Sequence, residues 1–138
     1  MGTTIRNKIS KKNKYYLPEH RFLELKHFCL QYPEWKARYL EFDSMVRYGG
    51  GEIRSSDVPD PVAYAAEKRE KYLKLMELVE QTAIAADADL YQYIINAVAY
   101  GISFVTLQTK YEIPCGKDLF YDRYRKFFWL LDKVREKI

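Results

Sequence analysis

Apolar side chains recur every three or four residues along most of the chain, which is the spacing of an amphipathic α-helix. The clearest stripe lies late in the sequence and consists of Leu119, Phe120, Tyr124, Phe127, Leu131 and Val134. No segment alternates polar and apolar residues as a half-buried strand does. The sequence therefore predicts an all-α protein with about six helices.

Prolines, glycines and helix-capping residues divide this pattern into segments. A first helix is expected from Leu17-Pro18 to just before Pro33. Asp60-Pro61 is a typical helix start, and Gly101 a typical helix end. The same reasoning places the remaining helices over 33–46, 61–84, 89–101, 103–111 and 117–136.

Composition divides the chain into four parts. Residues 1–14 show no apolar periodicity and carry five Lys or Arg and no acid, which predicts a flexible basic arm. Residues 48–60 contain Gly49-Gly50-Gly51, Ser55-Ser56 and Pro59, which predicts a loop. We expect a helical hairpin over 15–47, between arm and loop, and a helical bundle over 61–138.

Charge is unevenly distributed over the 138 residues, whose net charge is +4. Residues 1–16 carry +5 and residues 103–138 carry +3, whereas residues 17–102 carry −4. Two basic ends around an acidic middle favour a polyanionic partner such as DNA. The alternative is a solubilising tail on an ordinary protein surface.

The compartment follows from two absences in the sequence. Two cysteines are too few for a disulfide framework, so we expect a reducing, cytoplasmic location. No apolar run approaches the roughly 18 residues that a membrane span needs, and the basic N-terminal stretch lacks the apolar core of a secretory signal. We therefore expect no membrane partner.

The layout of the last third is that of a helix-turn-helix. A short helix over 103–111 and the turn Ile113-Pro114-Cys115-Gly116 precede a long helix over 117–136. In this motif the N-terminal half of the second helix enters the DNA major groove. The alternative is a helical hairpin with a solvated charged face.

The residues expected to contact double-stranded DNA are cations and one tyrosine. Arginine can bind guanine bidentately, while lysine and tyrosine reach phosphates or base edges. The predicted set comprises Lys117, Tyr121, Arg125 and Lys126 on the second helix, Lys110 before it, and Arg6, Lys8, Lys11 and Lys12 in the arm. One recognition helix rarely gives enough specificity, so a homodimer is expected, with helix 61–84 as its interface.

The stretch from Ile113 to Phe128, IPCGKDLFYDRYRKFF, resembles the end of late-gene transcription regulators of the RinA/ArpU type from phages of Firmicutes. Family members show a short I/V-P turn, then a helix with an aromatic pair and clustered Arg and Lys. The resemblance spans roughly residues 60–138. It implies a sigma-factor-like C-terminal helix-turn-helix and activation of late phage genes, for which we expect contact with host RNA polymerase. Tyr111-Glu112 stands where the family carries a glycine.

No catalytic, metal or cofactor site is predicted, and we expect a non-enzyme. His20 and His27 lie two helical turns apart with no third ligand. Cys29 falls on an apolar stripe. Cys115 lies beside a helix N-terminus and Lys117, both of which lower a thiol pKa, but no histidine is near it in sequence. An inert turn residue is the favoured interpretation.

A second class of function is also open. A phage-encoded inhibitor or adaptor that binds a host protein, of the anti-CRISPR or another anti-defence type, would use the same scaffold. The small size, the 13 tyrosines and the glycine-rich loop all suit a protein–protein surface. A helix-turn-helix does not by itself establish DNA binding.

Overall fold

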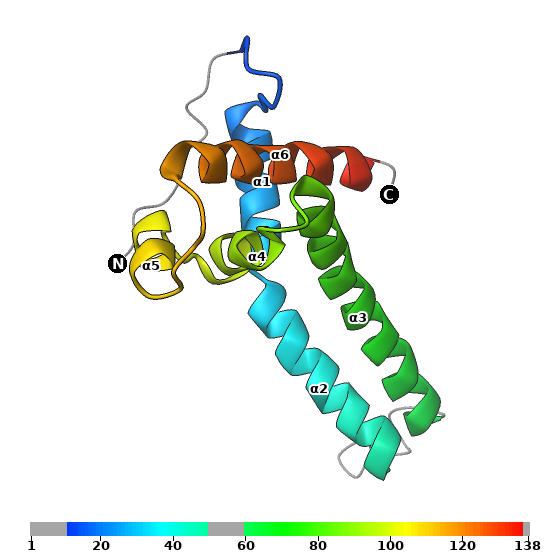
Figure 1. The fold of residues 1–138 in the computed structure, drawn as a ribbon. Helices are drawn as coiled ribbons and strands as arrows, with labels where there is room; N and C mark the ends of the chain where they lie inside the picture. Colours follow the sequence, from blue (N-terminus) through cyan, green and yellow to red (C-terminus); the bar gives the residue numbers. More distant parts are fainter. Residues whose placement is uncertain (1–10, 50–59, 137–138) are drawn as a thin grey trace. The chain divides into compact units, whose positions relative to one another are not determined.

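The computed structural model describes residues 11–49 and 60–136. Every regular element in these ranges is an α-helix (Figure 1), which confirms the all-α class. The helices are α1 (Glu19–Cys29), α2 (Tyr32–Tyr48), α3 (Pro61–Ala86), α4 (Tyr91–Tyr100), α5 (Phe104–Thr109) and α6 (Lys117–Glu136). Their bounds lie close to those expected from the sequence. The first ten residues of the predicted arm, including Arg6 and Lys8, lie outside the described residues.

Local capping explains where several helices begin and end. The Asp60 carboxylate accepts a hydrogen bond from the Ala63 amide (3.1 Å), and Pro61 takes the first helical position of α3, as the sequence predicts. The Ser103 hydroxyl accepts from the Thr106 amide (3.3 Å) and caps α5. Gly101 adopts the left-handed conformation (φ +66°) that ends α4.

The chain forms two compact units. One comprises residues up to Gln31 together with those from Val79 onward, and the other comprises Tyr32–Leu78. This division differs from the predicted one, in which residues 15–47 formed a helical hairpin. The periodicity of a sequence does not reveal which helices pack against each other. In the structure α1 packs on α4 and α6, whereas α2 packs within its own unit.

The first unit is built around one face of α6. Phe120, Phe127 and Leu131 are fully buried, and α1, α4 and α6 pack on one another. Figure 1 shows α6 (orange to red) crossing α1 (blue). At this crossing the rings of Phe22 and Phe128 meet edge to face, with centroids 5.0 Å apart. The core of this unit is therefore aromatic and shared by helices distant in sequence.

A polar contact fastens the same two helices. Arg21 Nε donates to the Asp132 carboxylate at 2.6 Å, and both side chains are largely shielded from solvent. Near it, the guanidinium of Arg135 lies 3.7 Å from the centre of the Phe28 ring. Both contacts join α1 to the last turns of α6, with Arg21 near the start of α1 and Phe28 near its end.

The second unit is an antiparallel hairpin of α2 and the first part of α3 (Figure 1). The Phe42 ring stacks on Tyr72 (6.2 Å between centroids) and meets the edge of Tyr64. The Asp43 carboxylate accepts hydrogen bonds from Arg47 on its own helix and from Arg69 on α3 (3.1 Å). Aromatic and ionic contacts thus hold this hairpin.

Some predicted core positions are exposed instead. Leu119 is 44% exposed, and Val134 is exposed too. Leu119 lies about 100° around the helix axis from its buried neighbour Phe120, so it points away from α1 and α4. Nor is any described helix both long and apolar enough to cross a bilayer.

The burial of α6 gives a stability prediction. Phe127→Ala should lower the free energy of unfolding by about 3–5 kcal/mol, because the cavity left by a fully buried ring cannot collapse completely. Leu119→Ala, on the exposed side of the same helix, should cost about 0.5 kcal/mol or less. Urea unfolding followed by circular dichroism measures both. Equal losses would mean that the inward face of α6 is misassigned.

Candidate nucleic-acid interface

The helices α5 and α6 form the pair in which the sequence predicts DNA contact. Phe104 of α5 packs against Phe120 of α6, with ring centroids 5.5 Å apart. The Tyr121 ring contacts both of them, at 6.0 and 5.7 Å. These rings fix α5 against the first turns of α6.

An open pocket of about 430 Å³ lies where the two helices meet. Its walls are Ser103, Phe104, Val105 and Gln108 from α5 and the capping position before it, and Lys117 and Tyr121 from α6. The Lys117 ammonium lies 5.7 Å from the centre of the Tyr121 ring, a cation–π contact. A cation and a phenol therefore share the rim of a concave surface.

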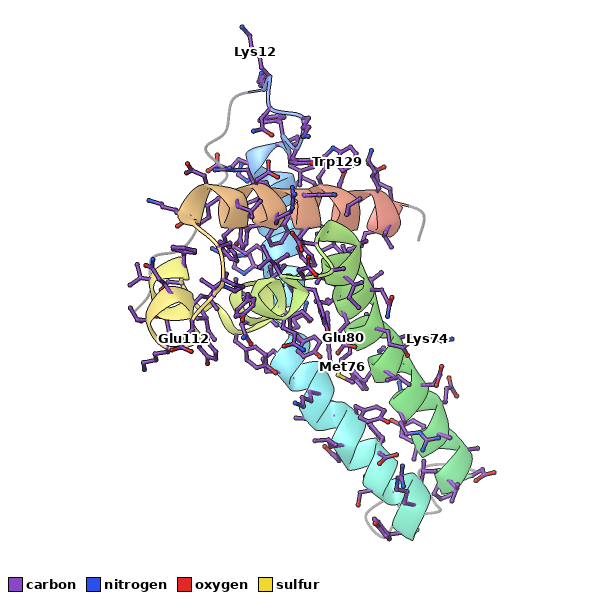
Figure 2. All side chains as sticks on the ribbon, in the orientation of Figure 1. Lys12, Lys74, Met76, Glu80, Glu112 and Trp129 are labelled. Carbon is purple, nitrogen blue, oxygen red and sulfur yellow. The ribbon has the colours of Figure 1, made fainter. Side chains whose placement is uncertain are left out.

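The linker between α5 and α6 covers residues 110–116 and is longer than the three or four residues usual in a helix-turn-helix. Ile113 is buried, and its amide donates to the Leu107 carbonyl at 3.1 Å. Glu112, labelled in Figure 2, has a φ of +51°. This is the left-handed region that favours glycine. Glu112 belongs to the dipeptide Tyr111-Glu112, which stands where the resemblance predicts a glycine.

A cluster of two carboxylates and one arginine joins α6 to the start of α4. Arg123 Nε donates to Asp87 at 3.0 Å, and its Nη1 donates to Asp122 at 2.6 Å. Asp87 also accepts the amides of Asp89 (2.9 Å) and Leu90 (3.0 Å). In the structure Asp122 binds Arg123.

These contacts set two pKa values. Burial would raise the pKa of the Asp87 carboxyl, but hydrogen bonds from the Leu90 and Asp89 amides and from Arg123 hold that pKa below its usual range. Burial, followed by the Asp87 charge, raises the pKa of the Cys115 thiol. Burial first, and the Asp87 carboxylate second, thus act against the helix N-terminus and Lys117, which by themselves lower a thiol pKa.

The predicted contact residues on and before α6 occupy different environments. Lys117 and Lys110 are exposed, whereas Tyr121 and Lys126 are partly buried. Arg125 is also partly buried, and its Nε is shielded from water with no hydrogen-bond partner among the described residues. Lys117, Tyr121 and Arg125 follow one another along α6 as predicted, whereas Lys126 lies about 180° around the axis from Lys117.

The described end of the predicted arm lies against α6. The Asn13 side chain accepts a hydrogen bond from the Tyr15 amide (2.8 Å), which closes a turn over Lys11–Tyr15. The Tyr15 ring meets Trp129 edge to face at 5.6 Å, and Lys14 lies 5.0 Å from the Tyr15 ring. Figure 2 shows Trp129 on the edge of α6 next to the segment that carries Lys12. Lys11 and Lys12 are exposed.

Sequence reasoning missed two members of this surface. Trp129 and Lys133 continue the i, i+4 series beyond Arg125, and the Lys133 ammonium lies 4.1 Å from the Trp129 ring. The same four-residue spacing that identified Lys117, Tyr121 and Arg125 could have found both. The predicted series stops at Arg125 because only the N-terminal half of a recognition helix is expected to enter the major groove.

On α6, more cations than acids lie outside the described ion pairs. Asp132 pairs with Arg21, and Asp122 pairs with Arg123, which it shares with Asp87. In the described part of the chain no ion pair involves Lys110, Lys117, Arg125, Lys126 or Lys133, and Asp118 stays exposed among them. The ion pairs therefore leave several cations of α6 without a carboxylate partner in the described part of the chain, although Arg123 is shared between Asp87 and Asp122.

The described residues contain no group of three or more His, Cys, Asp or Glu that could hold a metal ion. Comparison with protein-family models, with curated proteins and with solved structures gives no match.

The Asp87 cluster predicts an acid-sensitive contribution to stability. A carboxyl whose pKa is lowered by folding stabilises the protein above its unfolded pKa of about 3.9, and this stabilisation disappears as the pH falls through the folded pKa. Asp87→Asn should therefore lower the free energy of unfolding by about 1 kcal/mol at neutral pH and by less near pH 2. Urea unfolding at several pH values tests this.

Asp89→Asn is the matched control, because Asp89 is exposed and only its backbone takes part in the cluster. It should change the unfolding free energy little at any pH. A pH-independent loss in Asp87→Asn would rule out the charged contact with Arg123 as its cause.

The backbone of Glu112 gives a further prediction. Glu112→Gly should stabilise the protein by up to about 1 kcal/mol, because relief of the left-handed strain exceeds the entropy that glycine adds to the unfolded chain. Glu112→Ala removes the same exposed side chain but keeps Cβ, so it should bring no gain. If the two variants melt at the same temperature in calorimetry, the strain is absent.

Proposed function

We propose that the chain is a DNA-binding transcription regulator that contacts duplex DNA through α5 and α6. The observation that carries this proposal is the set of α6 cations with no described ion pair, which are Lys117, Arg125, Lys126 and Lys133. Phosphate contacts supply most of the affinity of such proteins. Lys117 and Lys110 reach phosphates, and Arg125 serves as the candidate base contact.

The resemblance of residues 113–128 to RinA/ArpU regulators supports a narrower version of this function. The protein would then act on phage or mobile-element late genes and contact host RNA polymerase from the promoter. A helix-turn-helix protein that reads a two-fold site binds as a dimer. We propose the exposed side of α3, where Val62 and Tyr64 lie, for that contact.

A protein-binding inhibitor or adaptor is the second candidate. Tyr48 and Leu40 on α2 are 81% and 56% exposed, and exposed aromatic and aliphatic side chains are typical anchors of protein interfaces. This candidate predicts no affinity for duplex DNA. It also places the sensitive residues on the α2–α3 hairpin rather than on α6.

The deciding measurement is binding of the purified protein to random-sequence duplex DNA at two salt concentrations. Binding that weakens steeply with salt is expected, with a slope of about −0.9 in log K against log salt for each phosphate contacted. Lys117→Ala should weaken binding and reduce that slope by about one. Absence of binding at low salt would contradict the proposal and favour the protein-binding candidate.

Lys74→Ala is the matched control. The Lys74 side chain is 74% exposed on α3, where it lies near Glu70 (4.0 Å), and it points away from the hairpin in Figure 2. The variant changes net charge by the same amount as Lys117→Ala. It should leave both the affinity and the salt slope close to those of the wild type.

A further inference from the structure

The pocket between α5 and α6 offers a ligand three kinds of surface. Phe104, Tyr121 and the 66% exposed Val105 supply apolar area. Gln108 supplies a side-chain amide, and Lys117 supplies the one charge among the lining residues. The pocket of about 430 Å³ therefore combines an apolar wall, a hydrogen-bonding group and a cation, and none of its lining residues is an acid.

The aromatic part of the pocket is formed before any ligand binds. The Phe104 ring is buried and packs on the fully buried Phe120 ring, with centroids 5.5 Å apart. The Tyr121 ring lies 6.0 Å from the Phe104 ring, and the two planes meet at 57°. Rings that the core holds in place do not have to be ordered by a ligand, which lowers the cost of binding. The two tilted planes form a corner that fits the face and the edge of one planar ring.

The polar groups of the pocket differ in whether they are already paired. The Ser103 hydroxyl accepts a hydrogen bond from the Thr106 amide (3.3 Å) and donates one to the Thr106 hydroxyl (3.1 Å), so it is occupied. No other described residue forms a hydrogen bond with the Gln108 side chain, and none forms an ion pair with Lys117. A ligand therefore meets two unpaired groups, one neutral and one cationic.

Size and charge limit the class of ligand. The volume of about 430 Å³ lies near the lower end of the range for small-molecule sites, about 300–1,000 Å³, and suits a ligand with one ring system. A lysine ammonium binds phosphate as a point charge, whereas a planar carboxylate is matched better by the arginine fork. The Lys117 ammonium lies 5.7 Å from the centre of the Tyr121 ring. The phosphate and the ring of the ligand must therefore be close together, as they are in a nucleotide.

An amide beside aromatic rings is suited to a nucleobase. The side-chain amide of a glutamine pairs bidentately with N6 and N7 of adenine, and proteins bind unpaired bases by stacking them on aromatic side chains. We propose that this pocket binds one unpaired adenine nucleotide. The base lies against Phe104 and Tyr121. Its N6–N7 edge pairs with Gln108, and its phosphate binds Lys117.

The open side of the pocket admits two sources of this nucleotide. A free mononucleotide such as AMP and an unpaired nucleotide of a single strand present the same base and phosphate. A base inside a duplex is paired and stacked, so it would first have to be extruded. The inference therefore goes beyond the proposed function, which concerns duplex DNA, although both use Lys117.

The test titrates the protein with AMP, with adenosine and with the 7-deaza analogue of AMP, and follows binding by ligand-observed NMR at low salt. Adenosine lacks the phosphate and should bind about tenfold more weakly than AMP, because a hydrogen bond to a charged group is lost. The 7-deaza analogue lacks the N7 acceptor and should bind roughly threefold to tenfold more weakly than AMP, because a neutral hydrogen bond is lost.

Two variants isolate the two polar contacts. In Lys117→Ala, AMP and adenosine should bind with equal affinity, because the phosphate has lost its partner. In Gln108→Ala, AMP and its 7-deaza analogue should bind with equal affinity, because N7 has lost its donor. Both side chains are exposed, so neither variant should unfold. Lys74→Ala changes net charge as Lys117→Ala does and should keep the wild-type affinity for all three ligands.

Single-stranded oligonucleotides identify the source of the nucleotide. If oligo(dA) binds more tightly than AMP and more tightly than oligo(dT), and Gln108→Ala removes both differences, the ligand is a nucleotide of a strand. If AMP binds at least as tightly as oligo(dA), the ligand is the free mononucleotide.

The outcomes separate this inference from the proposed function. If neither AMP nor oligo(dA) binds, or if Lys117→Ala and Gln108→Ala leave every affinity unchanged, the nucleotide site is absent. Binding of duplex DNA by the same protein would still support the proposed function, because Gln108 has no part in it. A protein that binds AMP with the expected losses but does not bind duplex DNA would support this inference and contradict the proposed function.

Discussion

Burial of the aromatic face of α6 between α1 and α4 holds together the unit of residues 11–31 and 79–136. Phe120, Phe127 and Phe128 are essentially removed from solvent, and each such ring stabilises the fold by roughly 1.5–3 kcal/mol. One side of α6 therefore lies in the protein core, and the other side faces water. One side must remain in the core, which fixes the direction in which its cations point.

Sequence periodicity found the helices because each buries one stripe, and it found the helix ends where Asp60, Gly101 and Ser103 cap them. Periodicity does not show which apolar stripes pack against each other. The Asp87–Arg123 contact joins residues 36 apart in sequence, and no local pattern predicts it. The left-handed Glu112 was equally hidden, because glutamate carries no turn signal.

The sequence predicted one part of the candidate contact surface and missed another. Lys117, Tyr121 and Arg125 were found from their spacing, but the partial burial of Arg125 depends on tertiary packing. Ion pairing also mattered. Arg123 binds Asp122 and Arg21 binds Asp132, and the second of these pairs joins helices that no local pattern connects. Composition counts charges, whereas a partner meets only those left uncompensated.

The pairing of α1 with α6 has a consequence for the order of folding. Arg21 and Asp132 are 111 residues apart, so α1 leaves the ribosome long before its partner is synthesised. Closing such a long loop costs more entropy than closing a hairpin. The α2–α3 hairpin can form during translation. The apolar stripe of α1 remains exposed to water until α6 has been synthesised. In that interval a chaperone that shields α1 would protect the nascent chain from aggregation.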